Sequence, residues 1–307
     1  MRRVALIAMA ILIGIGVYAT LSRLHVTSAR IMSVPSTHIY YLSGESKTFT
    51  LDFLVNTNQT FFTEHDAVMS VEIESEDATL PLNFEGLETV GTLHANHESM
   101  YHMRLHASQD FVTDQYRFEA LEATMNIHYK NNQTAALPVG EFVMHHFENS
   151  KGPLRMESMH NVHGRFDYGL TSKGYMVSLY NDSQTPITLN QFETGSQSVP
   201  VNDGLVNVSA RPYEPYMPIE SLVHGYEPTL SDAPMRQLIL DPGESKQFVV
   251  PFAYRDKATL LHRYPLTIAY QQGETAHTYK MEDFAFINSD MFVKENMPLL
   301  VPGVIHD

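Results

Sequence analysis

The chain has 307 residues, no cysteine and no tryptophan, and its 35 acidic and 20 basic residues give a formal net charge of −15 at pH 7. The lack of cysteine excludes disulfides, thiolate metal sites and cysteine nucleophiles. The acidic balance argues against nucleic acid and anionic lipid headgroups as partners, because both repel a negatively charged surface.

The N-terminus carries an uncharged apolar run. Two arginines precede it, it extends from Val4 to Leu21, and the chain beyond it is polar. A membrane-spanning helix needs roughly 17–25 apolar residues and a cleaved signal roughly 7–15, so the run favours a retained anchor. Small residues at Ala19 and Ala29 leave a cleaved signal, and hence a secreted protein, as the alternative. We expect residues 1–31 to form a signal anchor or signal peptide with a stalk, and the rest to be extracytoplasmic.

From His38 onward, apolar and polar residues alternate. The stretches 48–55, 101–105 and 247–254 each place apolar side chains at every second position, which predicts half-buried strands. In the third stretch, Pro251 falls on the polar side, which predicts an outward position on an edge strand. Useful helical periodicity does not follow the N-terminal run. Many short strands separated by turn residues predict a β-sandwich.

The chain also contains a weak internal repeat. Three short segments of its first half match three segments of its second half in the same order. The pairs are Leu54–Thr60 with Leu179–Thr185, His97–Ser99 with Gly243–Ser245, and Ile127–Tyr129 with Ile268–Tyr270.

These matches cover an Asn-containing strand end, a turn before an alternating strand and a closing hairpin. Over about residues 37–289, the pattern resembles tandem bacterial immunoglobulin-like domains of membrane-anchored or exported surface proteins. The resemblance implies an all-β fold with two Ig-like β-sandwiches, at 37–148 and 153–289, behind the N-terminal helix. A bacterial source also fits an exported chain without cysteine. Such domains bind or scaffold more often than they catalyse.

The second half contains a proline- and tyrosine-rich insertion at 211–234. Its five prolines disfavour regular sheet and favour extended backbone. Long loops of this kind are commonly functional, so the large side chains of the insertion are candidate partner-binding residues. They are Tyr213, Tyr216, Met217 and Tyr226. The alternative is an insertion that only packs over the edge of the sandwich.

Histidine and methionine are frequent, at 16 each, and they cluster. Imidazole and thioether ligands suit copper, so an extracytoplasmic copper-binding protein is an alternative function. Its candidate ligands are His145, His146, His160 and His163, the last two in an expected linker. Because no ligand spacing is defined, we predict no cofactor. No nucleophile elbow, HExxH motif or phosphate-binding loop occurs, so we predict no enzyme.

The tail at 290–307 is apolar but interrupted by prolines, and we expect it to pack along the second sandwich or to dock on a partner as an added strand. The whole sequence predicts a non-enzymatic extracytoplasmic binding or scaffold module anchored in a bacterial cell membrane. Its partners would be a protein or cell-envelope component, its own membrane through residues 4–21, and no nucleic acid. An accessory subunit of a membrane complex is a further alternative.

Overall fold

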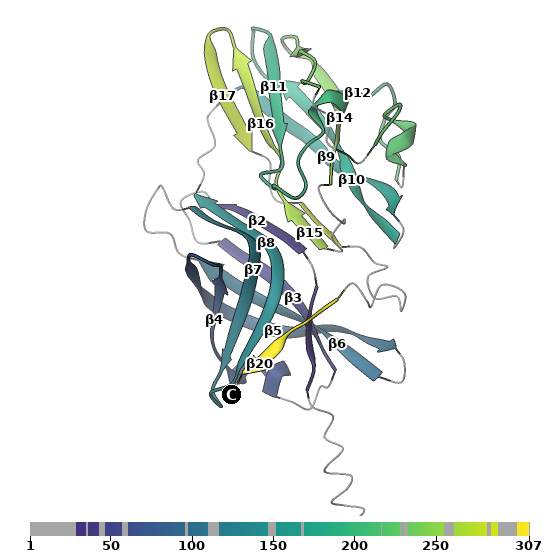
Figure 1. The fold of residues 1–307 in the computed structure, drawn as a ribbon. Coiled ribbons are helices and arrows are strands. Elements are labelled where there is room, and N and C mark those ends of the chain that lie inside the picture. Colours follow the sequence, from purple (N-terminus) through teal and green to yellow (C-terminus); the bar gives the residue numbers. More distant parts are fainter. Residues whose placement is uncertain are drawn as a thin grey trace, which may run out of the picture.

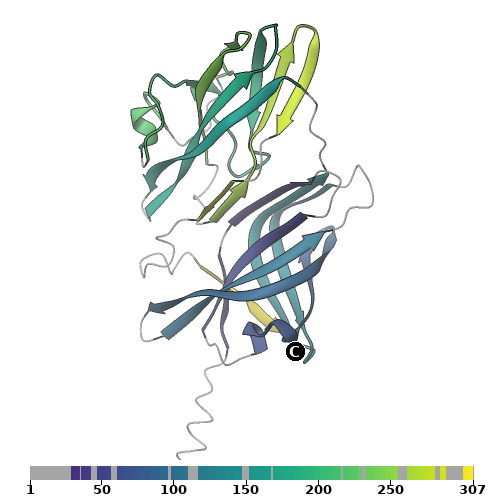
Figure 2. The same cartoon turned by 180° about the vertical axis from the view of Figure 1, so that it is seen from behind.

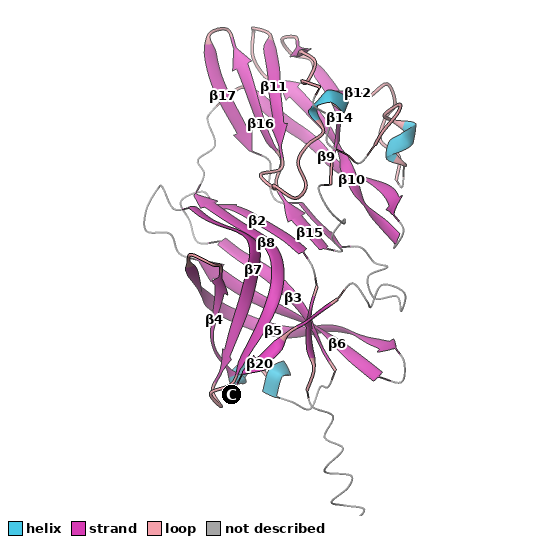
Figure 3. Ribbon diagram, in the orientation of Figure 1, coloured by secondary structure: helices cyan, strands magenta, loops and turns pink. Residues whose placement is uncertain are grey.

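A computed structural model describes residues 29–34, 36–42, 47–56, 61–95, 98–109, 117–146, 152–166, 169–215, 217–227, 229, 233–254, 261–280, 284–287 and 300–306. Within these ranges the secondary structure is all-β, as predicted, apart from four short 3₁₀ helices (Figure 3). No helix in the described residues is long and apolar enough to cross a membrane. The predicted anchor at 4–21 lies outside them.

The largest sheet within the described residues has twelve strands. Their bounds are β1 (Ile31–Ser33), β2 (Ser36–Leu42), β3 (Lys47–Val55), β4 (Val68–Glu74), β5 (Thr79–Ala95), β6 (Glu98–Gln109), β7 (Arg117–Tyr129), β8 (Thr134–His146), β15 (Leu261–Tyr264), β18 (Phe284–Ile287), β19 (Val301–Pro302) and β20 (Val304–His306). The hydrogen-bonded order is β18-β15-β2-β8-β7-β4-β5-β6-β3-β1-β19, and β20 pairs with β8. Short 3₁₀ helices η1 (Phe61–Thr63) and η2 (His65–Ala67) precede β4.

This sheet folds over on itself because β5 changes partners along its length. Residues 79–82 of β5 pair with β4, and residues 83–95 pair with β6, with register shifts after Phe84 and Thr89. Such bulges let one strand pass from one layer of a sandwich to the other. The two layers, visible in the lower part of Figure 1, enclose one apolar core.

Strand β3 shows how the sequence pattern builds that core. Phe49, Leu51, Phe53 and Val55 are at most 2 % exposed, which confirms the alternation seen in the sequence. The opposite face of β3 is covered as well, since Leu54 is fully buried. The alternation therefore predicted the core face of β3 correctly, but it gave no sign that the opposite face is covered as well.

Most of the described residues of the second half form two four-stranded sheets. Their strands are β9 (Leu154–Phe166), β10 (Gly169–Asn181), β11 (Ile187–Glu193), β12 (Asn207–Val208), β13 (Leu238–Leu240), β14 (Ser245–Pro251), β16 (Thr267–Gln272) and β17 (Thr275–Lys280). One sheet has the order β12-β14-β10-β9 and the other β13-β11-β16-β17. A second apolar core lies between them, so these sheets are consistent with a β-sandwich (Figure 2).

The two halves are not separate in the way that the predicted boundaries suggested. Strand β15, from the stretch assigned to the second sandwich, pairs in parallel with β2 of the first half, and β18 pairs with β15. In turn, Ile39 and Val143 of the first half belong to the second core. The matched repeat segments nevertheless occupy corresponding places, since β3 pairs with β6 as β10 pairs with β14.

Three local predictions were wrong. Pro251 is not exposed on an edge strand, because it is buried and pairs with Gly174 of β10. His160 and His163 lie within β9 and not in a linker. The described end of the tail packs on the first half and not the second, with β19 on β1 and β20 on β8.

The described end of the tail packs closely against β1 and β8. Strands β19 and β20 bridge β1 and β8 through Gly303, whose N–H donates to Ile31 at 2.9 Å. A Cβ atom at Gly303 would lie 2.7 Å from Leu137 Cδ2 and 3.0 Å from the Ala136 carbonyl oxygen. Only glycine therefore fits this position without a shift of its neighbours.

Candidate functional site

The proline- and tyrosine-rich insertion covers the outer face of the sheet that contains β9, β10 and β14. Met217, Ile219 and Val223 are buried against Val162 of β9 and Val249 of β14, forming a small third core. The short 3₁₀ helix η4 (Ile219–Ser221) lies in this segment. The apolar side chains of the insertion thus fit the alternative interpretation, in which the insertion packs over the sandwich.

Two of the predicted partner-binding tyrosines make contacts within the chain. The Tyr226 hydroxyl donates to the Phe252 carbonyl at 3.0 Å, and burial raises the pKa of this tyrosine. The Tyr213 ring stacks on His160 with centroids 4.1 Å apart. Tyr216 lies outside the described residues. A partner-binding role for the set stays a prediction, and Met217 would have to leave its core to take part.

The candidate copper ligands fall in two different places. His145 lies on β8, where its Nε2 is 3.2 Å from Glu119 Oε1, and burial lowers its pKa. His160 and His163 lie on β9 in the second half, and His163 contacts the amide nitrogen of Asn161. The side chain of His146 is outside the described set. Among the described residues, no group of three His, Cys, Asp or Glu is placed to hold a metal ion.

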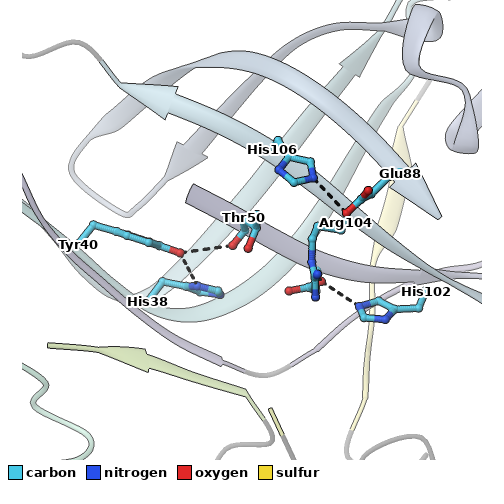
Figure 4. Close-up of polar contacts among 8 residues, drawn as sticks. His38, Tyr40, Thr50, Glu88, His102, Arg104 and His106 are labelled. Carbon is cyan, nitrogen blue, oxygen red and sulfur yellow. Dashed lines mark hydrogen bonds and ion pairs between the residues drawn. The ribbon is translucent and has the colours of Figure 1, made fainter. Parts of the chain in front are cut away.

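A polar cluster that the sequence did not single out lies between β3 and β6 (Figure 4). Asp52 is buried, and its Oδ1 accepts hydrogen bonds at 2.9 Å from both His102 Nε2 and Arg104 Nε. Its Oδ2 is buried without a hydrogen-bond partner. On the same face, His106 forms a separate pair with Glu88 at 3.2 Å. His102 and His106, four residues apart on β6, thus have different acidic partners.

Burial and the two neighbouring basic side chains have opposite effects on the pKa of Asp52. Burial alone would raise its pKa, but the hydrogen bond from His102 and the charge of Arg104 outweigh burial and hold the pKa below the ordinary value. The carboxylate is therefore ionised at neutral pH and fixes β3 against β6.

A second buried carboxylate connects the halves of the chain. Glu141 of β8 is 3 % exposed and accepts three hydrogen bonds from the loop that follows β11. The donors are the Ser196 hydroxyl at 2.6 Å, the Gln197 N–H at 2.7 Å and the Ser198 N–H at 3.2 Å. Because backbone amides of one half bind a side chain of the other, Glu141 fixes the loop on β8.

Beside Glu141 lies a cavity of about 660 Å³, which we call the junction cleft. Its walls come from the turn between β4 and β5, from β7, from β8 and from the loop after β11. The lining residues are Ser75, Glu76, Asp77, Ala78, Arg117, Phe118, Glu119, Ala120, Leu121, Glu122, Glu141, Val143 and Gln197. The lining therefore carries five carboxylates and one arginine, and this arginine is paired with Glu119.

Three of the five carboxylates that line the junction cleft face solvent. Glu76, Asp77 and Glu122 are exposed in the cleft, whereas Glu141 is enclosed by its three donors. The apolar side chain of Leu121 is also exposed, at 54 %. This lining is complementary to a ligand with a cationic group next to a small apolar surface.

No protein-family model matches the chain, and no curated protein matches it in sequence. Two solved structures are distant neighbours. One is named BspA_C_WT, with 9 % identity and a TM-score of 0.21, and the other is the Streptococcus agalactiae AgI/II polypeptide BspA C-terminal domain, with 8 % identity and a TM-score of 0.18. Each alignment covers 85 % of this chain and 99 % of the other. TM-scores of this size do not establish a common fold.

Proposed function

We propose that the chain is a non-enzymatic binding or scaffold module on the outer face of a bacterial cell membrane. In this proposal residues 4–21 anchor it, and the two halves are tandem Ig-like sandwiches joined by shared strands. The apolar N-terminal run and the cysteine-free composition support the location. The corresponding positions of the repeat segments support the tandem origin.

The observation that carries the binding function is the junction cleft. Its volume of about 660 Å³ lies within the roughly 300–1,000 Å³ of typical ligand sites. Both halves contribute to its walls, and the three hydrogen bonds of Glu141 hold those walls in one arrangement. A preformed cleft costs less conformational entropy on binding than a mobile surface does.

The occupant that fits best is a protein segment rich in lysine or arginine. Glu76, Asp77 and Glu122 come from two elements and surround the opening, so a basic side chain inside it would meet several carboxylates. Exposed ion pairs are weak, at roughly 0.5 kcal/mol each, so three of them contribute about 1.5 kcal/mol, or about a tenfold gain in affinity. Such a contribution favours basic partners without making binding permanent.

Peptide binding tests the proposal. The probe is a fluorescent hexapeptide of alternating lysine and glycine, titrated with the full chain in detergent at low salt, and a glutamate–glycine hexapeptide is its counterpart. The lysine probe should bind, and the combined change Glu76→Gln, Asp77→Asn and Glu122→Gln should weaken it about tenfold. The control Glu274→Gln removes an exposed carboxylate on the β16–β17 turn and should change nothing.

The expected binding should also weaken with salt, because exposed charge pairs are screened. If the triple variant binds the lysine probe as well as the unchanged protein does, the cleft is not the binding site. If both probes bind equally, charge does not select the partner.

A further inference from the structure

The turn between β11 and β12 holds two neighbouring buried oxygens that lack a hydrogen-bond partner. They are Oδ1 of Asn202 and Oδ1 of Asp203. Asn202 is only 1 % exposed, and Asp203 begins the short 3₁₀ helix η3 (Asp203–Leu205). Buried polar atoms are nearly always paired, so two adjacent orphans that are both acceptors indicate a missing donor or cation.

The orientation of the Asn202 amide is fixed by its other contacts. Its Nδ2 donates to the Thr229 carbonyl at 2.9 Å, and its backbone N–H donates to the Pro251 carbonyl at 2.8 Å. Rotating the amide by half a turn would place its oxygen against the Thr229 carbonyl oxygen, so the orphan oxygen cannot become a donor. Asn202 also stands where an asparagine usually caps a helix, yet its side chain makes no capping bond.

A second carboxylate lies near this turn. Burial raises the pKa of Asp203 to about 6, and the negative charge of Glu193, at the end of β11, adds to the rise. Asp203 thus has one buried oxygen without a partner and a second carboxylate nearby. A cation at this point would satisfy the orphan oxygens and offset the repulsion between the two carboxylates.

We propose that Asn202, Asp203 and Glu193 bind a calcium ion. All three offer oxygen, which hard cations prefer, and no sulfur or imidazole ligand belongs to the set. Calcium accepts a mixture of carboxylate and amide oxygens in irregular geometry, whereas magnesium demands a near-ideal octahedron and keeps most of its waters. The site is separate from the junction cleft, and it does not depend on the function proposed for that cleft.

The consequence for the fold is local. The turn leads from β11, which carries the loop held by Glu141, to β12 at the edge of the other sheet. An ion bound here would connect the two sheets of the second half at this end, so calcium should stabilise that half.

Calorimetric titration of the full chain in detergent, after chelation, tests this proposal with CaCl₂ and MgCl₂ as the probes. One calcium ion per chain should bind, with an affinity at least tenfold weaker after Asp203→Asn and weaker after Glu193→Gln. The matched control Glu274→Gln, an exposed carboxylate on the β16–β17 turn, should bind as the unchanged protein does. Magnesium should bind at least tenfold more weakly than calcium.

Melting temperatures separate binding from a merely structural role. In chelator at pH 7.5, Asp203→Asn should melt at or above the unchanged protein, because the unchanged protein must bury an unpaired charged oxygen. With calcium present, the unchanged protein should have the higher melting temperature, because calcium should stabilise it and not the Asp203→Asn variant. Absence of binding at about 10 mM calcium, tenfold above the weakest affinities of extracellular calcium modules, would overturn the proposal. So would binding that Asp203→Asn leaves intact, or equal binding of magnesium.

Discussion

Replacing Glu141 by alanine gives the sharpest test of how the two halves are joined. The change removes the acceptor of the Ser196 hydroxyl and of the Gln197 and Ser198 N–H groups. A hydrogen bond to a charged group contributes roughly 1.5–3 kcal/mol, but the three share one carboxylate and their contributions do not add fully. Water entering the junction cleft will also solvate part of the loop. We therefore expect Glu141→Ala to cost about 3–5 kcal/mol of unfolding free energy.

Two further variants separate charge from contact. Glu141→Gln keeps the shape and one acceptor oxygen but turns an amide donor toward the loop, and it should cost about 1–3 kcal/mol. Glu122→Gln changes an exposed carboxylate of the same cleft and should cost under about 0.5 kcal/mol. Denaturant titration measures all three, and hydrogen exchange at Gln197 and Ser198 should accelerate in the alanine variant. Equal costs for the Glu141 and Glu122 variants, with unchanged exchange, would refute this reasoning.

Four other outcomes follow from single contacts. Asp52 has a lowered pKa, so its stabilising effect is complete above the ordinary value of 3.8 and is lost as the pH falls through the folded value. The stability gap to Asp52→Asn in urea titrations should therefore shrink below pH 3.8. Gly303→Ala should cost about 1–3 kcal/mol in the same assay, because its Cβ would press on the neighbouring strand. Tyr226→Phe should cost about 1 kcal/mol through its lost hydrogen bond, and a cost near zero would contradict that bond. Phe53→Ala should cost roughly 3–5 kcal/mol, and a cost under 1 would contradict its core position.

The sequence predicted the strand class and the core faces well because both depend on local pattern. Side chains of a strand alternate between its two faces, so Phe49 and Phe53 had to share one face and Phe248 and Phe252 another, and all four are buried. The closing hairpins at Tyr129 and Tyr270 were likewise visible, since turn residues follow each strand directly.

The pattern could not show which segment covers the second face of a strand. Alternation placed Pro251 outward on an edge strand, yet Val201 and Asn202 pair with the backbone at the end of β14, where the Pro251 carbonyl accepts the Asn202 N–H. Val249, the other residue on that face, is buried under the insertion. Contacts between segments roughly 30–50 residues apart in the chain decide these positions, and alternation carries no information about them.

The predicted boundaries at 37–148 and 153–289 did not indicate that strands would pair between the two stretches. The repeat indicated two units, but it gave no sign that β15 would pair with β2 of the first half as well as with β18 of its own half. Parallel pairing with a distant strand needs a long connection and leaves no local turn signal. The tail was misplaced in the same way, because Gly303 is recognised as essential only when Leu137 and Ile31 stand beside it.

The net charge of −15 looked at first like a simple means of staying soluble, and three carboxylates show why that interpretation is incomplete. Asp52 is buried against two basic side chains, and Glu141 is buried against backbone amides. Asp203 keeps a buried oxygen with no partner. If acidity served solubility alone, neutralising any of them would cost as little as neutralising Glu122. From these contacts we instead expect a marked loss of stability for Glu141, a pH-dependent loss for Asp52 and, without calcium, no loss for Asp203. What each acidic residue does therefore depends on what faces it, which the charge count cannot tell.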